Sequence, residues 1–138
     1  MSFFLYFHFV CYRTARFGTA LCATEIGGLL NLKLKKFKGD NRLIEEDCDC
    51  NACRGKYTRG ALYCMINCDS SGIGAQLITH HNVAHMLRLV RTFRKAIIEG
   101  NFQEVISRFL IAHFGTVEQI PGWVTDALAA VGMKVVAN

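Results

Sequence analysis

The chain has 138 residues, of which 51% are hydrophobic and 20% are charged, and its formal net charge is +5 at pH 7. This composition fits one packed domain and excludes a disordered chain, while the single proline and 12 glycines exclude a proline-rich linker or a collagen-like repeat. No apolar run reaches the roughly 18–20 residues that span a bilayer. The excess of basic residues favours an anionic partner without identifying one.

The first predicted element is a β-hairpin. Residues 19–24 are β-prone, and residues 25–28 supply a turn whose glycines adopt a positive φ at little cost. Residues 30–35 then alternate strictly between leucine and polar side chains, which predicts a second strand with one dry face. The leucines of that face are Leu30, Leu32 and Leu34.

A group of lysines follows the hairpin's turn and accounts for much of the local positive charge. Its members are Lys33, Lys35, Lys36 and Lys38. Cations clustered on one face of a strand are suited to binding a phosphate backbone. A solvated surface is the alternative interpretation.

Seven cysteines indicate the chemistry of the chain. Their count is odd and no convincing secretory signal precedes them, so a disulfide framework is not expected. Three of them, Cys48, Cys50 and Cys53, form a C-x-C-x-x-C run. This spacing disfavours internal disulfides but allows three thiolates to surround one ion, and zinc prefers four thiolate or imidazole ligands in a tetrahedron. We therefore predict a zinc site, with three reduced, buried cysteines as the alternative.

The fourth zinc ligand must come from elsewhere in the chain, and the candidates are His80, His81, His85, Cys64 and Cys68. His81 directly precedes Asn82 and an amphipathic helix, which would fix the direction of its ring. Cys64 and Cys68 lie closer in sequence and compete with it. For His80 and His85, an ordinary histidine on the surface or on a helix face is the preferred interpretation.

After a short helix or turn at residues 57–63, the sequence predicts three helices. The first has apolar residues at helical spacing over residues 83–97 and ends with Gly100 at C′. The second begins at Asn101 as its cap, and the third has Pro121 in its first turn and ends at Gly132. The apolar residues of the third helix are Trp123, Ala127, Leu128 and Val131.

Several of these segments together resemble one family, the queuine tRNA-ribosyltransferases, also called tRNA-guanine transglycosylases. The segments are the RTARFG block that starts at Arg13, the cysteine run with the downstream His81-Asn82 pair, and the WVTDALAAVG stretch that starts at Trp123. The resemblance is to the eukaryotic catalytic subunit and covers the chain from Arg13 to about Met133.

The resemblance implies an α+β fold: a C-terminal fragment of a TIM (β/α)8 barrel with an inserted zinc-binding subdomain. The elements of the fragment, in chain order, are the β-hairpin, the metal loop and three helices. A complete barrel needs about 250 residues, more than this chain has. We expect residues 1–12 to be an atypical apolar leader and residues 13–138 to be the family-like part, with the zinc subdomain at about 19–98.

The implied activity is the exchange of guanine for queuine at the wobble position of tRNA, a glycosyl transfer. In the family an aspartate attacks the ribose and forms a covalent intermediate, which divides one difficult displacement into two easier ones. The aspartate's place, before the RTARFG block, is taken here by Phe7. We therefore assign no catalytic residue and expect the chain alone to be inactive. The alternative is a non-enzymatic zinc-binding module for RNA binding or subunit pairing.

The resemblance also implies the site residues and partners. The structural zinc, one per chain, is assigned to Cys48, Cys50, Cys53 and His81. The distance in sequence from Cys53 to His81 is slightly longer than in the family, so His80 stays the alternative ligand. The tRNA contacts are assigned to Arg13, Thr14 and Arg16. A heterodimer with the family's non-catalytic subunit is implied, in the cytoplasm, with association with the mitochondrial outer membrane also compatible.

Overall fold

The computed structural model describes residues 3–68 and 72–136 of the chain. Contacts divide it into two compact units, and each is described by itself. The first unit comprises Met1–Cys22 and Leu29–Leu87, and the second comprises Ala23–Gly28 and Arg88–Asn138. The long helix α4 contributes its first part to one unit and its last part to the other.

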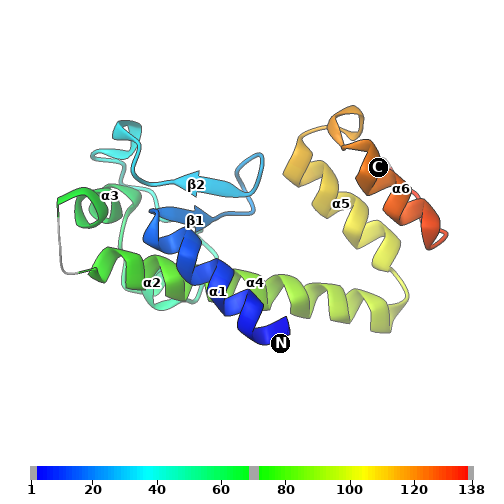
Figure 1. Cartoon of the computed structure of the whole chain (residues 1–138), viewed down its shortest axis with the longest axis horizontal. Coiled ribbons are helices and arrows are strands. Elements are labelled where there is room, and N and C mark those ends of the chain that lie inside the picture. Colours follow the sequence, from blue (N-terminus) through cyan, green and yellow to red (C-terminus); the bar gives the residue numbers. More distant parts are fainter. Residues whose placement is uncertain (1–2, 69–71, 137–138) are drawn as a thin grey trace. The chain divides into compact units, whose positions relative to one another are not determined.

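The first unit combines a two-stranded sheet with helices (Figure 1). Its elements are α1 (Phe3–Arg16), β1 (Thr19–Leu21), β2 (Leu29–Asn31), the 3-10 helix η1 (Lys35–Phe37), α2 (Asn51–Arg54), α3 (Arg59–Cys68) and the start of α4 (Ile73–Glu99). Helix α1 is not among the predicted elements, and it continues without a break across residue 12, the expected end of the leader. Although its sequence is apolar, no helix in the described residues is both long and apolar enough to cross a bilayer.

The predicted hairpin forms, with β1 and β2 antiparallel and Thr19 opposite Asn31. Its second strand is shorter than the alternating leucines suggest. The Asn31 side-chain oxygen accepts a hydrogen bond from the backbone N–H of Lys33 at 3.1 Å, which turns the chain and ends the strand. Leu30 and Leu32 are buried as expected, but Leu34 lies beyond this turn and is 47% exposed. The prediction that Leu34 lies on the dry face is wrong.

Helix α4 begins at Ile73, well before the predicted start near residue 83, so His81 and Asn82 lie inside the helix. The apolar pattern does not predict this earlier start because polar side chains occupy core positions of the helix. Ile78 is fully buried, and so are His81 and Asn82, one turn further on. The apolar periodicity is interrupted there, and with it the sequence signal for a helix.

The core of the first unit is continuous and includes the cysteine run. It joins buried side chains from α1, both strands, the loop before α2, and helices α2, α3 and α4. The buried residues are Ala15, Ala20, Cys22, Leu30, Leu32, Phe37, Ile44, Cys48, Cys50, Ala52, Cys53, Leu62 and Ile78.

The second unit consists of the end of α4, α5 (Phe102–Phe114), the 3-10 helix η2 (Val117–Gln119) and α6 (Gly122–Ala130). Its core is formed by Leu110, Ile120 and Val124. Gly100 and Gly132 both have φ 74° and follow the ends of α4 and α6, as predicted.

Two details of the second unit differ from the expectations. Asn101 precedes α5 but makes no side-chain capping bond. In α6, Trp123 is 72% exposed, and Val131, the residue that caps the end of this helix, is 65% exposed, whereas Val124 is buried and Leu128 packs against the core as predicted. The short helix therefore packs through Val124 and Leu128, and the prediction is wrong for Trp123 and Val131.

Candidate metal centre

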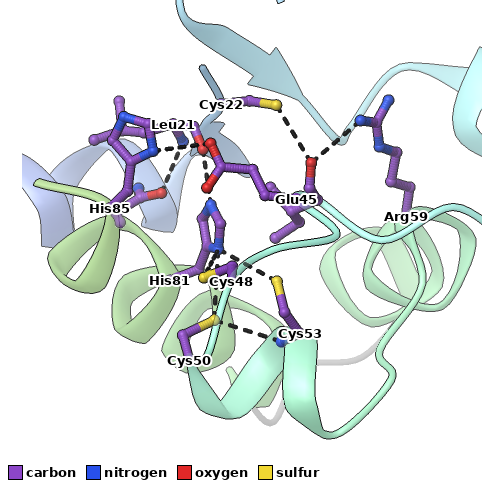
Figure 2. Close-up of polar contacts among 11 residues, drawn as sticks. Leu21, Cys22, Glu45, Cys48, Cys50, Cys53, Arg59, His81 and His85 are labelled. Atoms are coloured by element: carbon purple, nitrogen blue, oxygen red, sulfur yellow. Dashed lines mark hydrogen bonds and ion pairs between the residues drawn. The ribbon is translucent and has the colours of Figure 1, made fainter. Parts of the chain in front are cut away.

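The three cysteines of the C-x-C-x-x-C run converge because a single helical turn follows the first two. Cys50 is the N-cap of α2, and its sulfur accepts a hydrogen bond from the backbone N–H of Cys53 at 3.4 Å. This turn brings the two sulfurs to the same side, and Cys48 approaches from the preceding loop (Figure 2). All three side chains are buried.

Helix α4 brings the fourth group, His81, whose side chain is fully buried. Its Nδ1 lies 3.6 Å from the sulfur of Cys48 and 3.5 Å from the sulfurs of Cys50 and Cys53. The potential ligand atoms of these four residues all lie within 4.8 Å of one another. Figure 2 shows the ring of His81 with one nitrogen directed at all three sulfurs.

These distances match the edges of a tetrahedral zinc site. With Zn–S of about 2.3 Å and Zn–N of about 2.0–2.1 Å, a tetrahedron has S···N edges of about 3.6 Å. A hydrogen-bonding explanation is weaker, because a neutral Nδ1 has one lone pair and cannot accept from three thiols. The donor set and its spacing therefore fit a zinc ion.

The opposite nitrogen of the His81 ring has a defined partner. Nε2 lies 2.8 Å from the backbone oxygen of Leu21 in β1, to which it donates. This bond places the ring proton on Nε2 and leaves the lone pair of Nδ1 directed at the sulfurs. The histidine is therefore oriented as a ligand by a strand distant in sequence.

Asn82, for which the sequence predicts no role of its own, completes the attachment of β1 to α4. Its side-chain oxygen accepts from the N–H of Leu21 at 2.8 Å, and its Nδ2 donates to the oxygen of Thr19 at 3.0 Å and to the hydroxyl of Thr14 at 3.2 Å. His81 and Asn82 thus bond the backbone groups on the free edge of β1. The adjacent His-Asn pair was the signal available in the sequence.

The close packing of the sulfurs perturbs their acidity. A hydrogen bond from Cys53 is the main cause that holds the pKa of the Cys50 thiol well below its usual range, and His81 contributes further. The same hydrogen bond and burial raise the pKa of the Cys53 thiol. In the absence of a cation, one thiolate in this cluster opposes the formation of the next, and a divalent cation would remove that opposition.

The other candidates for the fourth ligand have different surroundings. His80 is exposed and its Nδ1 lies 3.3 Å from the side-chain nitrogen of Asn51. His85 pairs with Glu45 at 3.0 Å, and Cys64 and Cys68 are exposed on α3. Of the five candidates, the structure brings only His81 to the three sulfurs among the described residues.

The loop that carries the cysteines is held at its start by a buried cation that sequence reasoning missed. Arg59 is 5% exposed and donates to the backbone oxygens of Leu43 at 2.9 Å and Ile44 at 3.2 Å. The thiol of Cys22 donates to the same Ile44 oxygen at 3.3 Å (Figure 2).

The residues predicted to contact RNA lie at the end of α1. Arg13 and Arg16 are exposed in its last turn. Thr14 is half-buried, and its hydroxyl donates to the backbone oxygen of Val10 at 2.9 Å while it accepts from Asn82. The arginines therefore face solvent, whereas the hydroxyl of Thr14 belongs to the network inside the fold.

Comparison with known proteins adds an independent observation. The family model described as "Queuine tRNA-ribosyltransferase" matches residues 8–115. The chain is similar to the queuine tRNA-ribosyltransferase catalytic subunit of Caenorhabditis elegans, with 33% identity over 135 residues that cover 88% of the chain and 32% of that protein. It is also similar to the catalytic subunit of Schizosaccharomyces pombe, with 33% identity over 91% of the chain and 31% of that protein. The queuine tRNA-ribosyltransferase of Thermus thermophilus is 38% identical over 87% of the chain and 29% of its own length. The chain spans about a third of the length of these relatives.

Proposed function

The chain belongs to the queuine tRNA-ribosyltransferase family, and we propose that it serves the reaction of that family, the exchange of guanine for queuine in tRNA, as the zinc-holding portion of a catalytic subunit. The observation that carries this proposal is the buried group of three sulfurs and one imidazole nitrogen at tetrahedral spacing.

Zinc, when bound, would act as a structural ion. Cys48, Cys50, Cys53 and His81 would supply four ligands, which leaves no open position for a water or a substrate. The residues themselves explain what the ion would hold together: the cysteine loop, helix α4, and β1 through the bond from His81 to Leu21. The proposed role of the site is therefore to hold these segments together, and no step of the base exchange is assigned to it.

Within this function, Arg13 and Arg16 are the groups that would contact tRNA. They are exposed on one helical turn, and a guanidinium binds phosphates or base edges through paired hydrogen bonds. Thr14 is part of the same proposal, but its hydroxyl is already bonded to Val10 and Asn82, so its contribution would be to fix the end of α1.

For the fold, we propose that the chain corresponds to the C-terminal part of a TIM barrel with an inserted zinc subdomain. The helices and the small sheet with its Cys3His group support this proposal. The proposed boundaries are residue 13 for the start of the family-like part and about 19–98 for the zinc subdomain. The family match begins at residue 8, inside the proposed leader.

We further propose that this chain alone does not exchange bases. Phe7 occupies the position at which the resemblance predicts an aspartate, and a phenyl ring cannot attack a ribose carbon. The test is incorporation of labelled guanine into tRNA by the purified chain, with a full-length family enzyme as the positive control. Incorporation above the background of a protein-free reaction would contradict this part of the proposal.

The proposed partners are tRNA and the non-catalytic subunit of the family, in a heterodimer in the cytoplasm. Co-purification of the tagged chain with that subunit tests the pairing. Pairing or RNA binding in the absence of any role in base exchange would favour the non-enzymatic module instead.

A further inference from the structure

An exposed aromatic residue, Phe17, follows α1 directly and precedes β1 in the chain. Phe17 is 59% exposed. Its backbone is nevertheless fixed, because its N–H donates to the oxygen of Thr14 at 3.1 Å and the next residue, Gly18, has φ 74° and donates to Ala15 at 2.8 Å. An exposed ring on an ordered backbone contributes little to packing, so it is available for contact with a partner.

The pairing of the strands brings a lysine to the residue that follows Phe17. Thr19 lies opposite Asn31, and just beyond this pair the N–H of Leu32 donates to the oxygen of Gly18 at 2.8 Å, which brings the segment that carries Lys33 to Gly18. The Cγ of Lys33 would lie only 2.9 Å from a Cβ built on Gly18. The stem of Lys33 therefore packs over the backbone of Gly18, the residue after Phe17, and Lys33 is exposed.

Several exposed cations near Phe17 in the chain have no carboxylate partner among the described residues. The exposed cations on this part of the first unit, called here the basic surface, are Arg13, Arg16, Lys33, Lys35, Lys36 and Lys38. In the described part of the chain, none of the six has a carboxylate partner. Asp40, the acid that follows this segment, is bonded to Arg42 at 2.7 Å.

We propose that Phe17 stacks on an unpaired base of the tRNA substrate, while Lys33 and the other lysines of the basic surface hold the adjacent phosphates. This inference rests on the proposed function, because it names the part of the tRNA that the first unit would bind. Single-stranded RNA loops are bound by aromatic rings that stack on splayed bases and by cations that follow the backbone. The first unit offers an exposed ring together with exposed cations that have no carboxylate partner among the described residues.

Base stacking and phosphate binding depend on different parts of the RNA, so binding experiments can distinguish them. Stacking depends on the presence of a base, and its loss weakens binding by about tenfold or more. Phosphate binding is independent of bases and depends on salt, so removal of one lysine lowers the slope of log K against log salt by about one contact.

The test is fluorescence anisotropy with the reduced, zinc-supplemented chain and two labelled RNA hairpins. The first hairpin is an anticodon stem-loop with guanine at the wobble position, and the second has the same stem with an abasic loop. The variants are Phe17→Ala, Phe17→Trp and Lys33→Gln. The matched controls are Leu29→Ala, which removes another exposed apolar side chain of the same unit, and Lys95→Gln, which removes an exposed lysine paired with Glu99.

We expect Phe17→Ala to weaken binding of the intact loop about tenfold and to leave binding of the abasic loop unchanged, with Phe17→Trp close to the unaltered chain. Lys33→Gln should weaken both RNAs and reduce the salt slope, and both controls should have no effect. If the unaltered chain binds the intact loop but Phe17→Ala is indistinguishable from Leu29→Ala, the inference fails while the proposed function stands. If the unaltered chain binds neither hairpin, the proposed tRNA contact itself fails and the inference with it.

Discussion

Asn82 provides a quantitative test of how β1 is attached to α4. The perturbation is Asn82→Leu, which keeps the approximate shape of the side chain and removes its amide. Two backbone groups then lose their partner: the N–H of Leu21, bonded at 2.8 Å, and the carbonyl of Thr19, bonded at 3.0 Å.

An orphaned buried polar group costs about 1–3 kcal/mol. Both bonds are only partly buried, so water recovers some of this loss, and we expect Asn82→Leu to lower the free energy of unfolding by about 2–4 kcal/mol. That is a large part of the 5–15 kcal/mol typical of a domain. With a urea slope of about 2 kcal/mol per M, in the middle of the usual range, the midpoint should fall by about 1–2 M.

The assay is urea unfolding followed by circular dichroism on reduced, zinc-supplemented protein. The matched control is Asn67→Ala, because Asn67 is exposed on α3 and donates to the oxygen of Tyr63 at 2.9 Å. Its effect should stay within about 0.5 kcal/mol. A loss of less than about 1 kcal/mol for Asn82→Leu, equal to that of the control, would refute the reasoning.

Three further predictions concern the same unit. Arg59→Met should lower the free energy of unfolding by about 1–3 kcal/mol in a thermal melt, because it orphans the oxygen of Leu43 and leaves only the Cys22 thiol as donor to the oxygen of Ile44; a loss no larger than that of Arg42→Met, at an exposed arginine, would count against it. Gly18→Ala should cost about 1 kcal/mol more than Gly39→Ala. Both glycines have positive φ, 74° at Gly18 and 78° at Gly39, but of the two only Gly18 has a side chain close to the place of an added Cβ, with Lys33 at 2.9 Å. Equal losses of stability in the two variants would show that this close contact costs no free energy. The hydrogen bonds from Arg42 lower the pKa of Asp40 from 3.8 to about 2, so this carboxylate stabilises the fold above pH 3.8 and loses that contribution as the pH falls toward 2. An NMR titration should show this, and Arg42→Met should return the pKa toward 3.8; an unchanged pKa would exclude Arg42 as the cause.

The sequence predicted best those features that are encoded by local spacing. The cysteine run specifies three converging sulfurs because Cys50 and Cys53 lie on one helical turn. Gly100 and Gly132 mark helix ends because both take the positive φ that other residues avoid. These features need no knowledge of distant segments.

The features that the sequence did not reveal depend on contacts between distant segments. The start of α4 was missed because His81 and Asn82 occupy buried positions that an apolar pattern would assign to leucine or valine. The early end of β2 depends on a competing side-chain bond from Asn31, which alternation cannot show. The exposure of Trp123 follows from the packing of Val124 against the second core, a choice of face that a short helix leaves open.

The most direct measurement is the metal content of the purified, reduced chain by elemental mass spectrometry, with four single variants beside it. We predict one zinc per folded chain, retained in His80→Ala and Cys64→Ser and lost in Cys50→Ser and His81→Ala. A folded, reduced chain without zinc, or a chain that keeps its zinc when His81 is replaced, would contradict the assignment of this centre.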